Sequence, residues 1–172
     1  MELVRTAALT GYFEVAESLG LDADTVENVR LAGRLHDVGK IGVSDMVLAK
    51  PSALTPEEYA QVKEHVRIGL EILAPLRHLG HVLRYVADHH ERWDGKGYPK
   101  GLAGEEISIG GRILAAADAY EAVTSARTYR EAMTPEQALT HLARLAGSLL
   151  DPTVFAALRT VVERGRTLTF LE

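Results

Sequence analysis

The segment TPEEYAQVKEHVRIGLEIL, residues 55–73, gives the clearest indication of the fold class. Thr55 is suited to cap a helix, Pro56 suits the first helical position, and Glu58 stands where a capping box requires a glutamate. The apolar residues then recur at helical spacing. They share one stripe with His65: Val62, Val66, Gly69 and Leu73. This segment therefore predicts an amphipathic helix that carries a histidine on its inward face.

Helical signals recur outward along the chain in both directions. Residues 134–137 repeat the start signature, residues 151–152 predict the beginning of a last helix, and residues 2–19 form a proline-free first helix. Four glycines and a proline between residues 94 and 104 indicate an irregular loop, and residues 167–170 are one weak strand candidate. We expect an all-α bundle of about six or seven helices with one long glycine-rich loop, in a single domain over residues 1–172.

Composition narrows the chemistry that this chain can perform. Among its 172 residues there is no cysteine, which excludes a disulfide scaffold, a thiol nucleophile and cysteine-bound metals. The net charge of −5 argues against binding to DNA or RNA duplexes. No apolar run approaches 18 residues and no signal peptide is recognisable, so we expect no membrane insertion and a cytoplasmic location. The metal ligands that remain available are histidine, aspartate and glutamate.

Ligand-type residues fall on the apolar stripes of four separate predicted helices: His36, His65, His90 and Asp118. His36 continues the stripe of a helix that begins at residue 22 or 24. A buried carboxylate without a partner is very costly, so Asp118 requires a cation beside it. For one such residue alone, a hydrogen-bonded core histidine or a capped aspartate is the commoner explanation. Four of them favour a metal site, because helix bundles build such sites from inward-facing side chains.

Two pairs of adjacent residues add donors to this set: His36-Asp37 and His89-His90. On a helix, neighbours point about 100° apart, so one segment could serve two ions or chelate one ion from two directions. Imidazole and carboxylate ligands without sulfur suit iron, manganese, nickel, cobalt or catalytic zinc. Two ions side by side are the arrangement used for hydrolysing phosphate esters.

The same motifs resemble those of a known family. HDVGK at residues 36–40 is similar to the HDxGK signature of the HD phosphohydrolase superfamily, and HHERWDGKGYP at residues 89–99 resembles the defining segment of its HD-GYP subgroup. The similarity extends over residues 31–139. HD-GYP domains are all-α phosphodiesterases of the bacterial second messenger cyclic di-GMP. The resemblance thus implies hydrolysis of this cyclic dinucleotide to linear pGpG, GMP or both, whereas composition and spacing alone indicate only a metal-dependent hydrolase.

The resemblance also implies roles for single residues. Asp37 would bridge two ions and act in catalysis together with Lys40, which would lie near the reacting phosphate. Lys40, Arg127 and Arg130 would contact the substrate, and Tyr98 would close or pack the loop. Six residues would bind the metals: His36, Asp37, His65, His89, His90 and Asp118.

Some family members bind a third ion through an upstream glutamate and histidine. No histidine precedes His36 in this chain, although Glu2 or Glu14 could supply a carboxylate. We therefore expect two divalent metal ions. Iron and manganese are the preferred candidates, and nickel, cobalt and zinc are the alternatives. Gly110 and Gly111 stand where other members often have bulkier residues.

Two other functions stay open at this point. The chain could be an HD phosphohydrolase of another nucleotide, or a catalytically inactive signalling or interaction module. It could also be a fragment of a longer protein with a covalently linked sensor or receiver domain, or form a homodimer.

Overall fold

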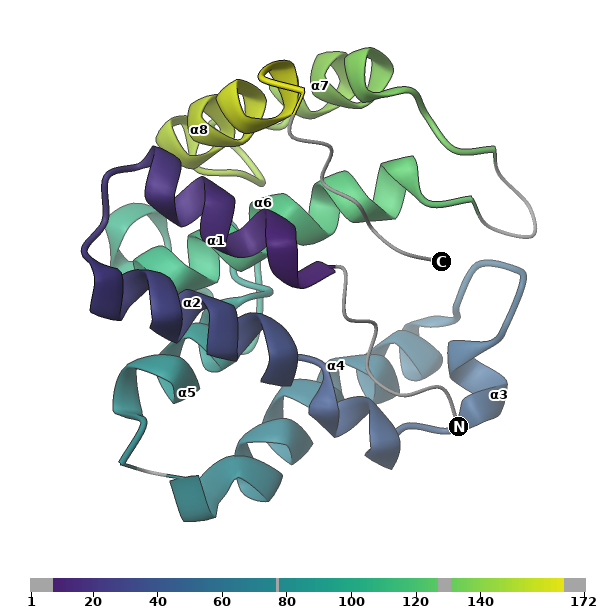
Figure 1. The fold of residues 1–172 in the computed structure, drawn as a ribbon. Helices are drawn as coiled ribbons and strands as arrows, with labels where there is room; N and C mark the ends of the chain where they lie inside the picture. The colour runs from purple at the N-terminus through teal and green to yellow at the C-terminus, as the bar shows by residue number, and fades with distance from the viewer. Residues whose placement is uncertain (1–7, 77, 127–130, 166–172) are drawn as a thin grey trace.

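Eight α-helices and three short 3₁₀ helices make up the computed structural model, which describes residues 8–76, 78–126 and 131–165 (Figure 1). The α-helices are α1 (Ala8–Ser18), α2 (Ala23–Leu35), α3 (Asp45–Leu48), α4 (Pro56–Leu73), α5 (Gly80–Asp88), α6 (Ile109–Thr124), α7 (Pro135–Ala143) and α8 (Pro152–Glu163). The 3₁₀ helices are η1 (Val38–Gly42), η2 (Ala74–Leu76) and η3 (Gly104–Glu106).

The all-α prediction is confirmed. The described residues contain no strand, only two isolated bridges between single residues. The helix count exceeds the expected six or seven because α3 is one four-residue turn, without a side-chain cap that would mark it in the sequence. The strand candidate at residues 167–170 lies outside the described part of the chain. No helix in that part is long and apolar enough to cross a membrane.

The helices begin where the local sequence supplies caps. The Thr55 hydroxyl accepts a hydrogen bond from the Glu58 amide at 3.2 Å, and the Glu58 carboxylate accepts one from the Thr55 amide at 2.7 Å. Helix α7 begins with the same reciprocal arrangement, and Asp151 caps α8. Of the two residues considered for the start of α2, Asp22 is the cap and Asp24 lies in the first turn. The predicted starts are thus confirmed, because capping depends on residues close together in sequence.

Helix α6 lies at the centre of the bundle, packed against α1, α2, α5, α7 and α8 (Figure 1). A Cβ atom on Gly110 would overlap the ring of Tyr85 in α5, so this glycine lets the two helices approach closely. The fully buried apolar side chains of this core come from six helices, α6 included, and comprise among others Tyr12, Val15, Val29, Val82, Val86, Ile113, Leu114, Ala138 and Leu158. The core is therefore apolar and stands beside the candidate ligands rather than around them.

Segment η1 follows α2 directly and packs against the middle of α4. A Cβ atom on Gly39 would overlap the backbone carbonyl of His65, so only glycine permits this approach. The glycine of the HDVGK motif thereby brings Asp37, which precedes η1, beside His65 of α4.

Candidate metal centre

The six predicted metal ligands converge at one place inside the bundle. They come from the end of α2, the middle of α4, the segment after α5 and the middle of α6: His36, Asp37, His65, His89, His90 and Asp118. Asp37 is central, because its Oδ2 lies 3.5 Å from His36 Nε2 and its Oδ1 lies 3.7 Å from His65 Nε2. Asp118 Oδ2 faces His36 Nε2 at 3.5 Å from the other side.

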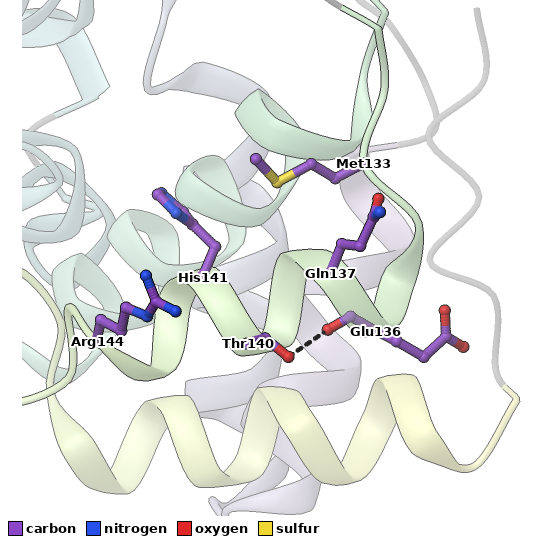
Figure 2. A pocket seen from close by; sticks show the side chains of 6 residues that line it. All are labelled: Met133, Glu136, Gln137, Thr140, His141 and Arg144. Atoms are coloured by element: carbon purple, nitrogen blue, oxygen red, sulfur yellow. Dashed lines mark hydrogen bonds between the residues drawn. The ribbon is translucent and has the colours of Figure 1, made fainter.

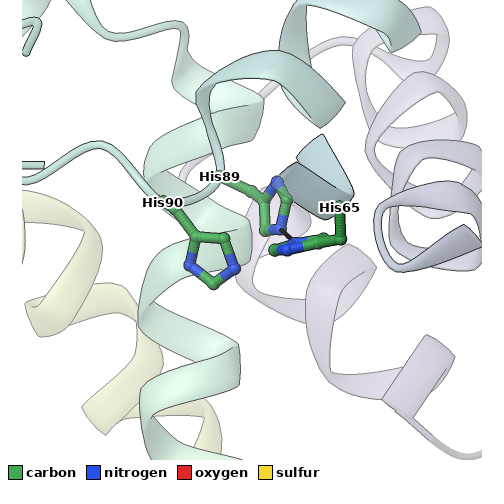
Figure 3. Close-up of side chains that lie close together, drawn as sticks. All are labelled: His65, His89 and His90. Carbon is green, nitrogen blue, oxygen red and sulfur yellow. Dashed lines mark hydrogen bonds between the residues drawn. The ribbon is translucent and has the colours of Figure 1, made fainter. Parts of the chain in front are cut away.

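Three histidines form the tightest group in this centre (Figure 3). One ligand atom from each of His65, His89 and His90 lies within 4.8 Å of the others. His65 Nε2 is 3.4 Å from His89 Nε2, and the rings of His89 and His90 are 4.0 Å apart between centroids. Nitrogen ligands about 2.0–2.1 Å from one ion lie up to about 4.2 Å apart. The three imidazoles could therefore bind one ion after small adjustments.

Backbone carbonyls orient most of these imidazoles. Nδ1 of His36, His65 and His89 lies 2.8, 2.6 and 2.6 Å from the carbonyl oxygen of the residue three positions earlier. A carbonyl oxygen can only accept, so each Nδ1 carries a proton. In the neutral ring, Nε2 then presents its lone pair to the centre, which is how metal-binding histidines are commonly held.

Burial keeps the histidine triad of His65, His89 and His90 neutral. It lowers the pKa of His65 and brings that of His89 well below the ordinary value. Burial, helped by the neighbouring His65, lowers the pKa of His90 to about 3. His36 differs: burial would lower its pKa, but the carboxylates of Asp118 and Asp37 together outweigh that effect and raise it. The triad is thus ready to bind a cation without losing protons.

The two adjacent pairs directly follow the last residues of two helices. Helices α2 and α5 end at Leu35 and Asp88, so both pairs stand at helix ends instead of within a helix. The rings of His89 and His90 lie side by side, with 41° between their planes.

Lys40 forms the solvent-facing side of the centre with Asp37. Its Nζ lies 2.5 Å from Asp37 Oδ2, and the two side chains are 43% and 41% exposed, whereas His65 is buried. Burial would raise the pKa of Asp37, but the neighbouring His36 and Lys40 outweigh it and lower the pKa. The centre is therefore open to solvent at a charged pair. Arg127 and Arg130, the other predicted substrate contacts, lie outside the described residues, as does Glu2.

Tyr12 of α1 was not identified from the sequence. Its hydroxyl donates a hydrogen bond to Asp118, and its fully buried ring meets the ring of His36 edge-on with 5.9 Å between centroids. Burial, together with the charge of Asp118, raises the pKa of Tyr12, so the hydroxyl stays a donor. No local pattern marks this residue, because its partner lies 106 positions away.

The glycine-rich loop is fastened over the centre by Glu91, the second residue that sequence reasoning missed. Its carboxylate accepts hydrogen bonds from the amides of Lys100 at 2.7 Å and Leu102 at 3.0 Å. Tyr98 then stacks on His90, with 4.8 Å between ring centroids and 25° between planes. Tyr98 thus packs the loop against a candidate ligand, as expected. The sequence feature that could have drawn attention to Glu91 is its position directly after His90.

A separate surface pocket of about 500 Å³ lies along α7 (Figure 2). It shares no residue with the metal centre and is lined by Met133, Glu136, Gln137, Thr140, His141 and Arg144. Among the described residues, the group of side chains placed to hold a metal ion is instead His65, His89 and His90.

Residues 3–154 match the HD domain family, and the chain therefore belongs to that family. Within it, the HD pair at residues 36–37 and the triplet at residues 97–99 are those of the HD-GYP subgroup.

Two curated relatives and one solved structure illustrate this membership. The chain is 40% identical over 163 residues to a cyclic di-GMP phosphodiesterase of Thermotoga maritima, covering 91% of this chain and 44% of the relative. It is 39% identical over 140 residues to 3'3'-cGAMP-specific phosphodiesterase 2 of Vibrio cholerae, with 80% and 27% covered. The chain thus spans less than half the length of these relatives. An HDGYP protein of Bdellovibrio bacteriovorus shares the fold with a TM-score of 0.72 at 23% identity, covering 91% of this chain and 50% of that one.

Proposed function

We propose that this chain is a metal-dependent phosphodiesterase that hydrolyses cyclic di-GMP to linear pGpG, GMP or both. The observation that carries the proposal is the convergence of four imidazoles and two carboxylates around Asp37. The Thermotoga maritima relative, which bears the name of this activity, supports the choice of substrate.

Two divalent ions fit the donors, with iron or manganese the preferred metals. The histidine triad would hold one ion, and His36 with Asp118 would hold the other. Asp37 would lie between them, since one of its oxygens faces His36 and the other faces His65. Nitrogen and oxygen donors without sulfur suit these metals. Bound ions would supply an activated water near neutral pH and neutralise phosphate charge.

The remaining steps belong to the side chains around the ions. Lys40, half-exposed beside Asp37, would pair with the phosphate under attack and stabilise its developing negative charge. Arg127 and Arg130 would orient the diester and screen its second phosphate. Because the protein carries a net charge of −5, positive charge must be concentrated at this opening to attract an anionic substrate.

The test is turnover by the purified chain after metal analysis and reloading with iron under anaerobic conditions or with manganese. The His36→Ala/Asp37→Ala variant should lose metal-dependent cleavage of cyclic di-GMP while its far-ultraviolet circular dichroism is kept. A matched control is His78→Ala/Asp45→Ala, which removes the same residue types at exposed positions. Cleavage at the parental rate by the first variant would refute the mechanism.

A second candidate substrate is 3'3'-cGAMP, because the Vibrio cholerae relative is named for it. Rates on cyclic di-GMP, 3'3'-cGAMP, cyclic mononucleotides and bis-p-nitrophenyl phosphate distinguish the two assignments and test other phosphoesters. A metal-loaded protein that cleaves none of them would instead be an interaction module. The linked sensor domain and the homodimer stay predictions.

A further inference from the structure

A cluster of two tyrosines and a lysine extends outward from the metal centre; we call it the outer cluster. Tyr98 stacks on His90, and Tyr59 of α4 meets Tyr98 edge-on, with 6.3 Å between centroids and 85° between planes. The ammonium of Lys63, one turn further along α4, lies 5.3 Å from the Tyr59 ring centroid and 5.9 Å from that of Tyr98. The cluster thus connects a candidate ligand with the surface, where Tyr59 is 48% exposed.

Lys63 forms no ion pair with a carboxylate in the part of the chain that the structure describes. Three other lysines have carboxylate partners: Lys40 with Asp37, Lys50 with Glu58 and Lys100 with Asp88. Among the described residues, no carboxylate oxygen lies within the 4.0 Å ion-pair distance of Lys63. An ammonium has three N–H donors, and its attraction to the two rings is electrostatic rather than a hydrogen bond. The Lys63 ammonium can therefore still donate hydrogen bonds to a ligand.

Ring and ammonium together match a purine base. Half-exposed aromatic faces bind bases by stacking, largely without regard to their identity. The Lys63 ammonium stands over the Tyr59 ring, 5.3 Å from its centroid, and leaves part of that half-exposed ring uncovered. A base that stacks on the uncovered part would present its edge to the ammonium. Guanine presents two acceptors there, O6 and N7, whereas adenine places a donor amino group beside N7. A lysine in this position therefore favours guanine.

We propose that Tyr59 and Lys63 form an outer subsite that binds a guanine base of the cyclic dinucleotide, with Lys63 selecting guanine over adenine. This inference rests on the proposed function, since the metal centre next to Tyr98 would cleave the diester attached to that base. Tyr59 contributes stacking to any purine, and Lys63 contributes the preference.

Lys63→Met tests the selection, because it removes the charge and keeps an unbranched side chain against the two rings. The expected result is a rise in KM for cyclic di-GMP of about 5- to 30-fold with kcat unchanged, and little change for cyclic di-AMP. Lys63→Arg should restore the preference, since a guanidinium also pairs with O6 and N7. Tyr59→Ala should raise KM for both dinucleotides. Cleavage of bis-p-nitrophenyl phosphate, which has no base, is measured for each variant and reports on the metal centre separately from base binding.

Lys50→Met is the matched control, because its ammonium is already held by Glu58 at 2.6 Å. It should leave the ratio of the two KM values unchanged. A Lys63→Met variant whose KM for cyclic di-GMP stays within twofold of the parent, or rises equally for both dinucleotides, would overturn the proposal.

Binding without turnover separates this inference from the proposed function. The same two dinucleotides are titrated calorimetrically into His36→Ala/Asp37→Ala, with and without Lys63→Met. A guanine preference that disappears with Lys63 supports the subsite even if hydrolysis fails. A preference that persists without Lys63 refutes the subsite even if the chain is an active phosphodiesterase.

Discussion

The hydroxyl of Tyr12 donates a 2.5 Å hydrogen bond to Oδ1 of Asp118 and so joins the first helix to the central one at the metal centre. This bond occupies one carboxylate oxygen, while Oδ2 faces His36 at 3.5 Å. Tyr12 therefore fixes which oxygen of Asp118 is available to a cation.

Removing only that hydroxyl should weaken metal binding. We expect Tyr12→Phe to lower the affinity for manganese by about 10-fold, because partners that orient ligands typically contribute 10- to 100-fold. The metal-free protein should lose about 1.5–3 kcal/mol of stability, the range for a hydrogen bond to a charged group. Competition with a chelating dye measures the affinity, and urea unfolding measures the stability. Tyr85→Phe is the control, since Tyr85 is also buried but packs on Gly110. Equal affinities in both variants would show that Tyr12 does not orient Asp118.

The carboxylate of Glu91 should determine how firmly the glycine-rich loop is held. Glu91→Gln keeps the size of the side chain but turns one acceptor into a donor that faces an amide, so one of the bonds to Lys100 and Leu102 is lost. We expect a loss of about 1–3 kcal/mol and faster hydrogen exchange at those two amides. Glu105→Gln, at an exposed position nearby, should change neither quantity. Unchanged exchange in Glu91→Gln would contradict the fastening role.

A methyl group at position 39 should separate η1 from α4. Gly39→Ala places a Cβ atom against the His65 carbonyl, so we expect a loss of about 3 kcal/mol and weaker metal binding as Asp37 moves away from His65. Gly80→Ala is the control, because no atom lies within 4 Å of a Cβ there. Thermal unfolding and metal titration compare them; a stable Gly39→Ala protein with full metal affinity would exclude this packing constraint.

The loop should lose an acid-sensitive contact below pH 4. Arg92 donates hydrogen bonds of 2.9 and 2.7 Å to Asp94 and, with burial opposing it, lowers the pKa of that carboxyl from 3.8 to about 2. A pKa that is lower in the folded state stabilises the fold above pH 3.8, and this contribution disappears as the pH falls through 2.

Asp94→Asn should therefore unfold at a lower temperature than the parent at pH 6, with the difference shrinking toward pH 3. Asp45→Asn, at an exposed position in α3, provides the charge-matched control. A difference between Asp94→Asn and the parent that is independent of pH would mean that the Asp94 charge does not stabilise the loop.

Sequence reasoning succeeded where the determining chemistry is local. The starts of α4, α7 and α8 depend on caps within three residues, and the stripe through His65 needs only helical periodicity. Prediction failed where interacting residues are far apart in sequence, and where a helix ends without a local signal. Tyr12 could not be identified because its partner is 106 residues away. The end of α5 at Asp88 was not predicted either, because the apolar stripe continues to His90.

Three of the imidazoles bond to a carbonyl within their own helical segment. The protein's own backbone therefore fixes the rotation and tautomer of these rings without help from an ion. A divalent ion that binds here would therefore meet imidazoles that the chain already holds in position, whichever of the candidate metals it is.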